Sequence, residues 1–236
     1  MEATRNMDIE IRIVRSNRKS IIGEVLPDGN LNVRAPLWAS SEMINDFLDK
    51  YEDKFLPLVK RNREWCDTQG TYVLKYGGDL LFLGKRVPII ADEDRPNGNM
   101  AQYKNGAFVV RPDLSENEMR QCVENLLYDL AKPIYKKKLE HYANAMGIPY
   151  IAWTIGNARK RLGSCDSNGK ITLSWRVIMM SEYAIDVLIV HELAHLKQLN
   201  HSKAFHEEVA KILPDHQARM IEYNDYAARL HWEGWL

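Results

Sequence analysis

The chain has 236 residues, of which 45% are hydrophobic and 27% are charged. These values are typical of a globular protein and exclude a disordered or fibrous chain. Its 32 basic residues balance its 32 acidic residues, so no net charge favours nucleic acid or a membrane surface as a partner. No run of about 18 apolar residues is present, and the first residues lack the apolar stretch of a secretion signal.

The cysteines are three in number and far apart, at positions 66, 122 and 165. An odd, dispersed set argues against a disulfide framework and for a reducing compartment. We therefore expect a cytoplasmic protein with no membrane partner.

The first third of the sequence is predicted to be rich in β-strands. Apolar residues alternate over 9–14, and two further apolar runs, 20–26 and 31–34, flank Pro27-Asp28-Gly29-Asn30. Asp-Gly between two such runs predicts a hairpin, because glycine accepts a positive φ without a steric clash. Pro36 is expected to end this segment.

A helix and a second group of strands are predicted next. Ser40 or Ser41 is a suitable N-cap for a helix whose apolar residues follow helical spacing to Phe55. Short apolar runs between residues 71 and 111, separated by turns such as Pro96-Asn97-Gly98, predict three or four more strands.

The second half is predicted to be mainly helical. Ser115-Glu116-Asn117-Glu118 has the pattern of a capping box, and it opens a long helical stretch that should bend or break near Pro133 and end at Gly147. Asn168-Gly169 predicts a turn between two strands, after which we expect two helices to the C-terminus.

The segment His191-Glu192-Leu193-Ala194-His195 carries the clearest chemical signal. Residues four apart on a helix lie on one face, so His191 and His195 can bind the same ion, and neutral imidazole is a good zinc donor. Glu192 lies about 100° around the helix from His191, near enough to hold a water without being a ligand. We predict one Zn²⁺ per chain, with Glu192 as general base.

A catalytic zinc needs a third protein ligand. His201 is six residues beyond His195 and would lie about 9 Å further along a continuous helix, too far to share an ion. It can be the ligand if the helix ends near Gln198 and the chain turns back, with Asn200 in a left-handed conformation and Ser202 as the next N-cap. The competing third ligands are His206, Glu207, Glu208 and Asp215.

Four segments resemble the YgjP-like metallopeptidase family, which is related to the SprT-like and WLM proteases. They are Arg161-Leu162-Gly163-Ser164-Cys165, residues 169–176, residues 191–197 and Asn200-His201-Ser202-Lys203-Ala204-Phe205. Leu162 departs from the tryptophan usual in that family, and His206 stands where an aromatic residue is usual.

The resemblance implies an α+β fold, in which a β-rich N-terminal region packs on a zincin-like helical catalytic core with a small sheet. We place these regions at 1–112 and 113–236, as parts of one continuous family unit. The resemblance also implies that His191, His195 and His201 bind the metal and that Glu192 is the base.

We therefore predict a zinc-dependent hydrolase acting on peptides or proteins. Glu192 would take a proton from the attacking water, and Arg161 is a candidate for stabilising charge in the transition state, although it can equally be a surface arginine.

Three other functions remain open. The first is hydrolysis of nucleoside triphosphates, with phosphate held by basic residues of 132–138 and 159–161. The second is a nucleic-acid-associated SprT-like protease, which the neutral net charge disfavours. The third is a zinc-stabilised scaffold without catalysis, in which Glu192 would be idle.

Overall fold

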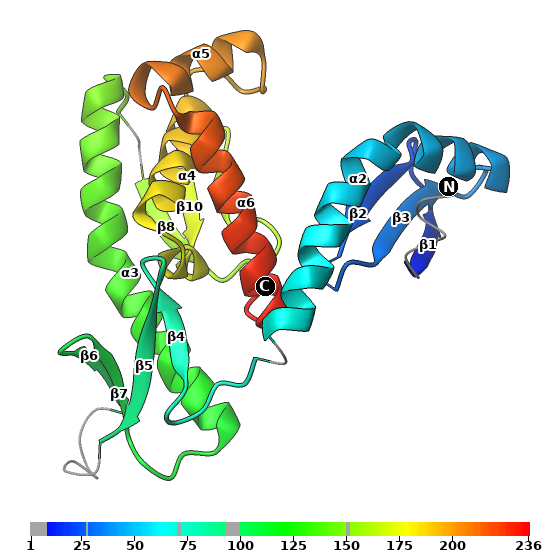
Figure 1. Ribbon diagram of the computed structural model, residues 1–236. Coiled ribbons are helices and arrows are strands. Elements are labelled where there is room, and N and C mark those ends of the chain that lie inside the picture. Colours follow the sequence, from blue (N-terminus) through cyan, green and yellow to red (C-terminus); the bar gives the residue numbers. More distant parts are fainter. Residues whose placement is uncertain (1–8, 27, 70–71, 93–99, 150–151) are drawn as a thin grey trace. The chain divides into compact units, whose positions relative to one another are not determined.

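The structure is a computed structural model that describes residues 9–26, 28–69, 72–92, 100–149 and 152–236 (Figure 1). It divides into two compact units. The first unit contains residues 1–72 and 231–234, and the second contains residues 73–230 and 235–236. Each unit is described by itself below.

The first unit is a three-stranded sheet and one long helix. Its elements are β1 (Ile11–Ser16), β2 (Ile22–Val25), β3 (Leu31–Pro36) and α2 (Ser41–Gln69). The strand order is β1-β3-β2, with β2 antiparallel and β1 parallel to β3. The predicted hairpin between β2 and β3 is confirmed, and Gly29 has the positive φ of 78° that its turn requires. Residue 27 of that turn lies outside the described residues.

The core of the first unit lies between β3 and the start of α2. Alternate residues of β3 are buried together with apolar residues of the helix, namely Leu31, Val33, Ala35, Ala39, Ile44 and Leu48. The helix begins at Ser41, as predicted, but continues past Pro57 to Gln69, well beyond the expected stretch.

The second unit opens with a four-stranded sheet. Its strands are β4 (Asp79–Phe82), β5 (Lys85–Ala91), β6 (Ala101–Lys104) and β7 (Ala107–Val110), in the order β4-β5-β7-β6. The prediction of three or four strands is confirmed. The turn expected at Pro96-Asn97-Gly98 lies outside the described residues.

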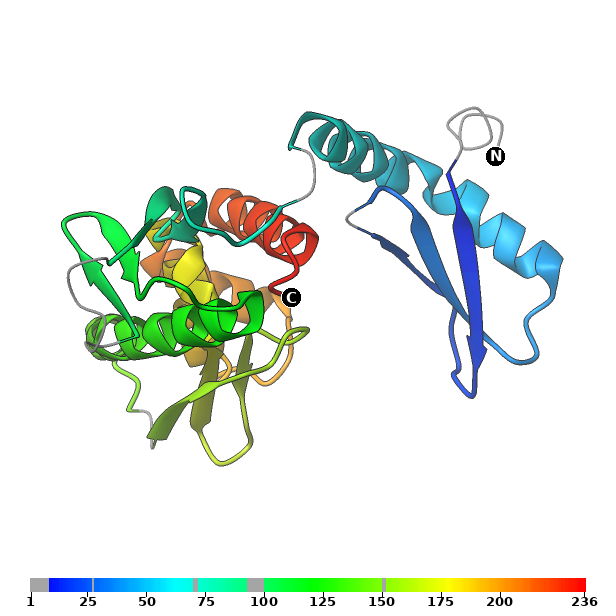
Figure 2. The same cartoon turned by 90° about the horizontal axis from the view of Figure 1, so that it is seen from below.

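A long helix, α3 (Glu116–Met146), connects this sheet to the rest of the second unit (Figures 1 and 2). The capping box is present, with the Ser115 hydroxyl accepting from the Glu118 N–H and the Glu118 carboxylate accepting from the Ser115 N–H. Gly147 ends the helix in the left-handed conformation, as predicted. Of the bend or break predicted near Pro133, the break is absent, because a buried stripe from Met119 to Met146 holds α3 as one helix.

The remainder of the second unit is a small sheet covered by helices. The elements are β8 (Ala152–Gly156), β9 (Gly163–Cys165), β10 (Lys170–Ser174), η1 (Trp175–Met179), α4 (Glu182–Ala194), α5 (Lys203–Ile212) and α6 (His216–Trp232), of which residues 216–230 belong to this unit. The strand order is β8-β10-β9, so β9 is an edge strand. The prediction of two terminal helices is corrected to three, because Pro214 separates α5 from α6.

The α+β class is confirmed, with five α-helices and three small sheets among the described residues. The boundary between the two compact units lies between Tyr72 and Val73. The sequence instead predicts the change from a β-rich to a helical region near residue 112. The difference arises because the β4–β7 sheet contacts α3 and η1 and so belongs with the helices. No helix in the described part of the chain is long and apolar enough to cross a membrane.

Candidate metal centre

The candidate centre lies at the C-terminal end of α4, a helix buried on almost every side. Ser181 caps its start by accepting from the Ala184 N–H, and the helix contacts α3, α5 and β9. Residues 185–190, which precede His191, are apolar except for Asp186. The Asp186 carboxylate pairs with Lys138 at 2.7 Å and with Arg219 at 3.6 Å. A buried carboxylate requires such partners, so these ion pairs allow α4 to be buried.

Three histidine side chains converge at this end of α4. The Nε2 atom of His191 lies 3.2 Å from that of His195 and 3.0 Å from that of His201. Their ligand atoms all lie within 4.8 Å of one another, and no other group of this kind occurs in the described part of the chain.

The competing third ligands lie outside this group. Glu208 pairs with Lys197 and Lys211, and Asp215 pairs with Arg219. His206 packs against Phe205 and His216. In the part of the chain that the structure describes, neither these residues nor Glu207 lie in the group formed by His191, His195 and His201.

The chain turns back after α4, as a third ligand at His201 requires. The helix ends at Ala194, and the Lys197 and Gln198 N–H groups both donate to the Ala194 carbonyl at 3.0 and 2.9 Å. Ser202 is the N-cap residue of α5, as predicted. The left-handed conformation expected for Asn200 is wrong, because Asn200 is not among the described residues with a positive φ.

Phe205 supports all three imidazoles. Its ring centroid lies 4.8 Å from that of His191, 4.7 Å from that of His195 and 4.9 Å from that of His201. The side chain is only 1% exposed, so it forms a fixed wall behind the rings. Sequence reasoning included Phe205 only as the last residue of a family-like segment.

Burial favours the neutral imidazoles that a metal needs, and a hydrogen bond orients one of them. The Nδ1–H of His195 donates to the Gln198 carbonyl at 3.1 Å, which leaves the Nε2 lone pair facing the other rings. Burial, followed by the neighbouring histidines, lowers the pKa of His191 to about 4. Burial also lowers the pKa of His195.

The arrangement fits a zinc ion. Bonds of about 2.0–2.1 Å in tetrahedral geometry place neighbouring nitrogen ligands about 3.3 Å apart. The observed separations of 3.2 and 3.0 Å are close to that value. Three histidine ligands with a fourth position for water is a donor set of catalytic zinc sites.

Glu192 lies beside the histidines and against the edge strand β9. Glu192 is only 5% exposed, and the Cys165 backbone N–H acts to lower the pKa of its carboxyl group. A Cβ atom at Gly163 would lie 2.5 Å from the Glu192 Oε1 atom, so only glycine leaves room for this carboxylate. Sequence reasoning did not identify this role of β9, because it depends on contact between segments distant in the chain.

The charge of Glu192 is set by opposing effects. Burial raises the pKa of Glu192 to about 7, while the Arg161 cation and the Cys165 N–H act to lower it. Arg161 also lowers the pKa of His195 through its charge. The exposed guanidinium of Arg161 therefore acts electrostatically on the candidate centre.

Two of the basic residues considered for phosphate binding are paired within the protein. The Lys138 ammonium group lies 2.7 Å from the Asp186 carboxylate and 3.0 Å from that of Glu182. Lys136 lies 3.9 Å from Glu140 on the same helix. These carboxylates reduce the positive charge that this part of α3 can offer a phosphate.

Comparison with known proteins gave a family and two structures. The family described as YgjP-like, metallopeptidase domain, matches residues 19–224. A search of curated proteins found no match. The zymogen of abylysin, a metallopeptidase of Pyrococcus abyssi, is similar at 25% identity and a TM-score of 0.37, over 41% of this chain and 95% of its own. The zymogen of jannalysin from Methanocaldococcus jannaschii is similar at 19% identity and a TM-score of 0.34, over 37% of this chain and 94% of its own.

The convergence of the histidines predicts that replacing His201 with alanine weakens zinc binding. The variant loses one of the three nitrogen donors. Loss of a residue that only hydrogen-bonds to a ligand weakens metal binding about 10- to 100-fold, so we expect the Kd for zinc to rise by more than this. Competition against a chromogenic chelator measures this Kd.

His206 is the matched control, because it lies near the centre on α5 but outside the histidine group. The His206→Ala variant should bind zinc as tightly as the unchanged protein. Equal losses in the two variants, or none in His201→Ala, would contradict the assignment.

Proposed function

The chain belongs to the YgjP-like metallopeptidase family of metal-dependent hydrolases, and we propose that it cleaves peptide bonds with a single zinc ion held by His191, His195 and His201. The observation that carries this proposal is the convergence of three imidazoles beside one buried carboxylate. When bound, zinc supplies Lewis acidity, which lowers the pKa of water towards about 7 and polarises a carbonyl group.

Glu192 is proposed as the general base. It would accept a proton from the attacking water as the new C–O bond forms, and return a proton to the amine nitrogen as the C–N bond breaks. A base works best when its pKa is near the working pH, and burial raises the pKa of Glu192 to about 7. The Arg161 cation favours the ionised form that accepts the proton.

Arg161 is proposed to stabilise the negative charge that develops on the carbonyl oxygen. A guanidinium group is always charged and can donate hydrogen bonds to such an oxygen. Its electrostatic effect on both Glu192 and His195 supports this role.

Peptides are favoured over nucleoside triphosphates as substrates. Family membership supports a peptidase, and Lys138 is paired with Asp186 and Glu182. The proposal is tested by removing metal with a chelator, restoring zinc, and assaying casein-derived peptides and nucleoside triphosphates in parallel. We expect zinc-dependent cleavage of peptides, whereas zinc-dependent hydrolysis of the triphosphates alone would overturn it.

In the same assay, the Glu192→Gln variant should lose nearly all turnover but still bind zinc. The amide keeps the shape of the carboxylate but cannot accept the proton, and general acid–base catalysis contributes about 10²- to 10⁴-fold. Chelator competition on the same sample checks that the metal is retained. Full activity in this variant would reject Glu192 as the base.

The contact between Gly163 and Glu192 predicts a second catalytic defect. In Gly163→Ala, the new Cβ would meet Oε1 of Glu192 at 2.5 Å and Cδ1 of Leu188 at 2.8 Å. We expect the carboxylate to move and kcat to fall about 100-fold, with KM and zinc affinity nearly unchanged, because a displacement of about 1 Å can have that effect.

Gly156→Ala in β8 is the matched control, because its Cβ would meet Cγ2 of Thr172 at 2.9 Å in the same sheet but not Glu192. A fall in kcat of the same size in both variants would show that Gly163 acts through the stability of the sheet. Thermal unfolding of both variants accompanies the kinetics.

A further inference from the structure

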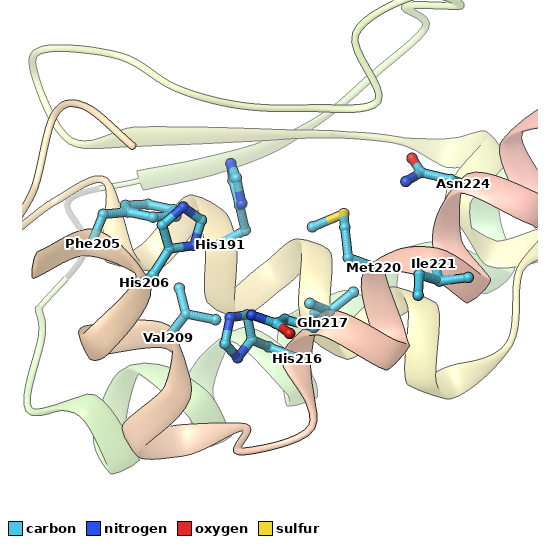
Figure 3. A pocket seen from close by; sticks show the side chains of 10 residues that line it. His191, Phe205, His206, Val209, His216, Gln217, Met220, Ile221 and Asn224 are labelled. Carbon is cyan, nitrogen blue, oxygen red and sulfur yellow. The ribbon is translucent and has the colours of Figure 1, made fainter. Parts of the chain in front are cut away.

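A pocket of about 430 Å³ lies between α4, α5 and α6, and His191 forms part of its wall (Figure 3). In Figure 3 the end of the Met220 side chain points from α6 towards His191, with Phe205 and His206 of α5 nearby. This volume lies within the range of about 300–1,000 Å³ typical of ligand sites. The pocket is therefore large enough for the side chain of a bound molecule.

The surface of the pocket is mostly apolar, although half of its ten lining residues are His, Gln or Asn. Its buried part is formed by Val187, Phe205 and Val209, which are packed in the core of the second unit and hold their positions. None of the residues that line it, as the structure describes them, is Asp, Glu, Lys or Arg. A charged side chain would lose hydration there and find no Asp, Glu, Lys or Arg with which to form an ion pair, whereas an apolar side chain would gain from leaving water.

The rim of the pocket carries exposed apolar surface. Ile221 on α6 is 63% exposed although it lines an apolar cavity, and Met220 beside it is half-buried. An apolar group entering the pocket would cover part of this surface. Methionine also adapts its shape to different partners, which suits a site that accepts several apolar side chains.

His191 connects the pocket to the centre. The same imidazole converges with His195 and His201 and also forms part of the pocket wall. Consecutive Cα atoms of a peptide are about 3.8 Å apart, so a residue whose side chain enters beside His191 lies next to the peptide bond presented to the centre.

Resting on the proposed peptidase function, we propose that this pocket selects peptides with a large apolar residue directly beside the scissile bond, and that Met220 and Ile221 set its specificity. Phe, Leu and Met are the expected residues. Acidic and basic side chains at that position are disfavoured.

The test uses the zinc-loaded, full-length protein. Cleavage sites in a mixture of proteome-derived peptides are first mapped by mass spectrometry, which identifies the selective position. Matched peptides with Phe, Leu, Ala, Asp or Lys at that position then give kcat/KM values. We expect Phe and Leu to exceed Ala by about 10- to 100-fold, the range set by apolar contacts in such pockets.

Two variants should change this preference in different directions. Met220→Trp narrows the pocket and should shift preference from Phe towards Ala. Ile221→Lys places a cation at the rim and should raise the kcat/KM of the Asp peptide relative to the Phe peptide. A variant that merely folds poorly would lower all values together and leave their ratios unchanged.

Ala218→Lys is the matched control, because Ala218 is exposed on the same helix but does not line the pocket. Its ratios should equal those of the unchanged protein. Binding of the same peptides to Glu192→Gln, followed by fluorescence anisotropy, gives a readout that is independent of turnover and should rank Phe above Ala.

The outcomes separate the two proposals. Cleavage without any apolar preference, or variants that alter all peptides equally, would overturn the role of the pocket and leave the peptidase intact. If the unchanged protein cleaves no peptide, both proposals fail.

Discussion

The candidate centre depends on the burial of α4. This helix is apolar on nearly every face, and the ion pairs of Asp186 with Lys138 and Arg219 compensate its one interior charge before His191. Because α4 is held by α3, α5 and β9, the side chains at its C-terminal end have fixed positions. Without that packing, the spacing of His191, Glu192 and His195 in the sequence would not hold their side chains in fixed positions.

The same burial sets the chemistry of the site. It lowers the pKa of His191 to about 4, which keeps the imidazole neutral and able to bind metal. It raises the pKa of Glu192 to about 7, a value that suits the proposed general base. Two opposite shifts from one cause are thus consistent with the roles proposed for His191 as ligand and Glu192 as base.

The sequence predicted the local parts of the site well and the non-local parts poorly. A four-residue spacing on a helix places two imidazoles together, so His191 and His195 could be paired from the sequence alone. The return of His201 to the histidine pair was expected, although Asn200 does not adopt the left-handed conformation predicted for it. The roles of Gly163 and Phe205 could not be predicted, because they arise from contacts that no local pattern encodes.

X-ray absorption at the zinc edge of the zinc-loaded protein tests the central claim most directly. Three imidazole nitrogens and one water oxygen at about 2.0–2.1 Å are predicted, with one imidazole lost in His201→Ala. A shell that contains sulfur, or one composed of oxygen alone, would contradict the account. So would a spectrum that does not change when His201 is replaced.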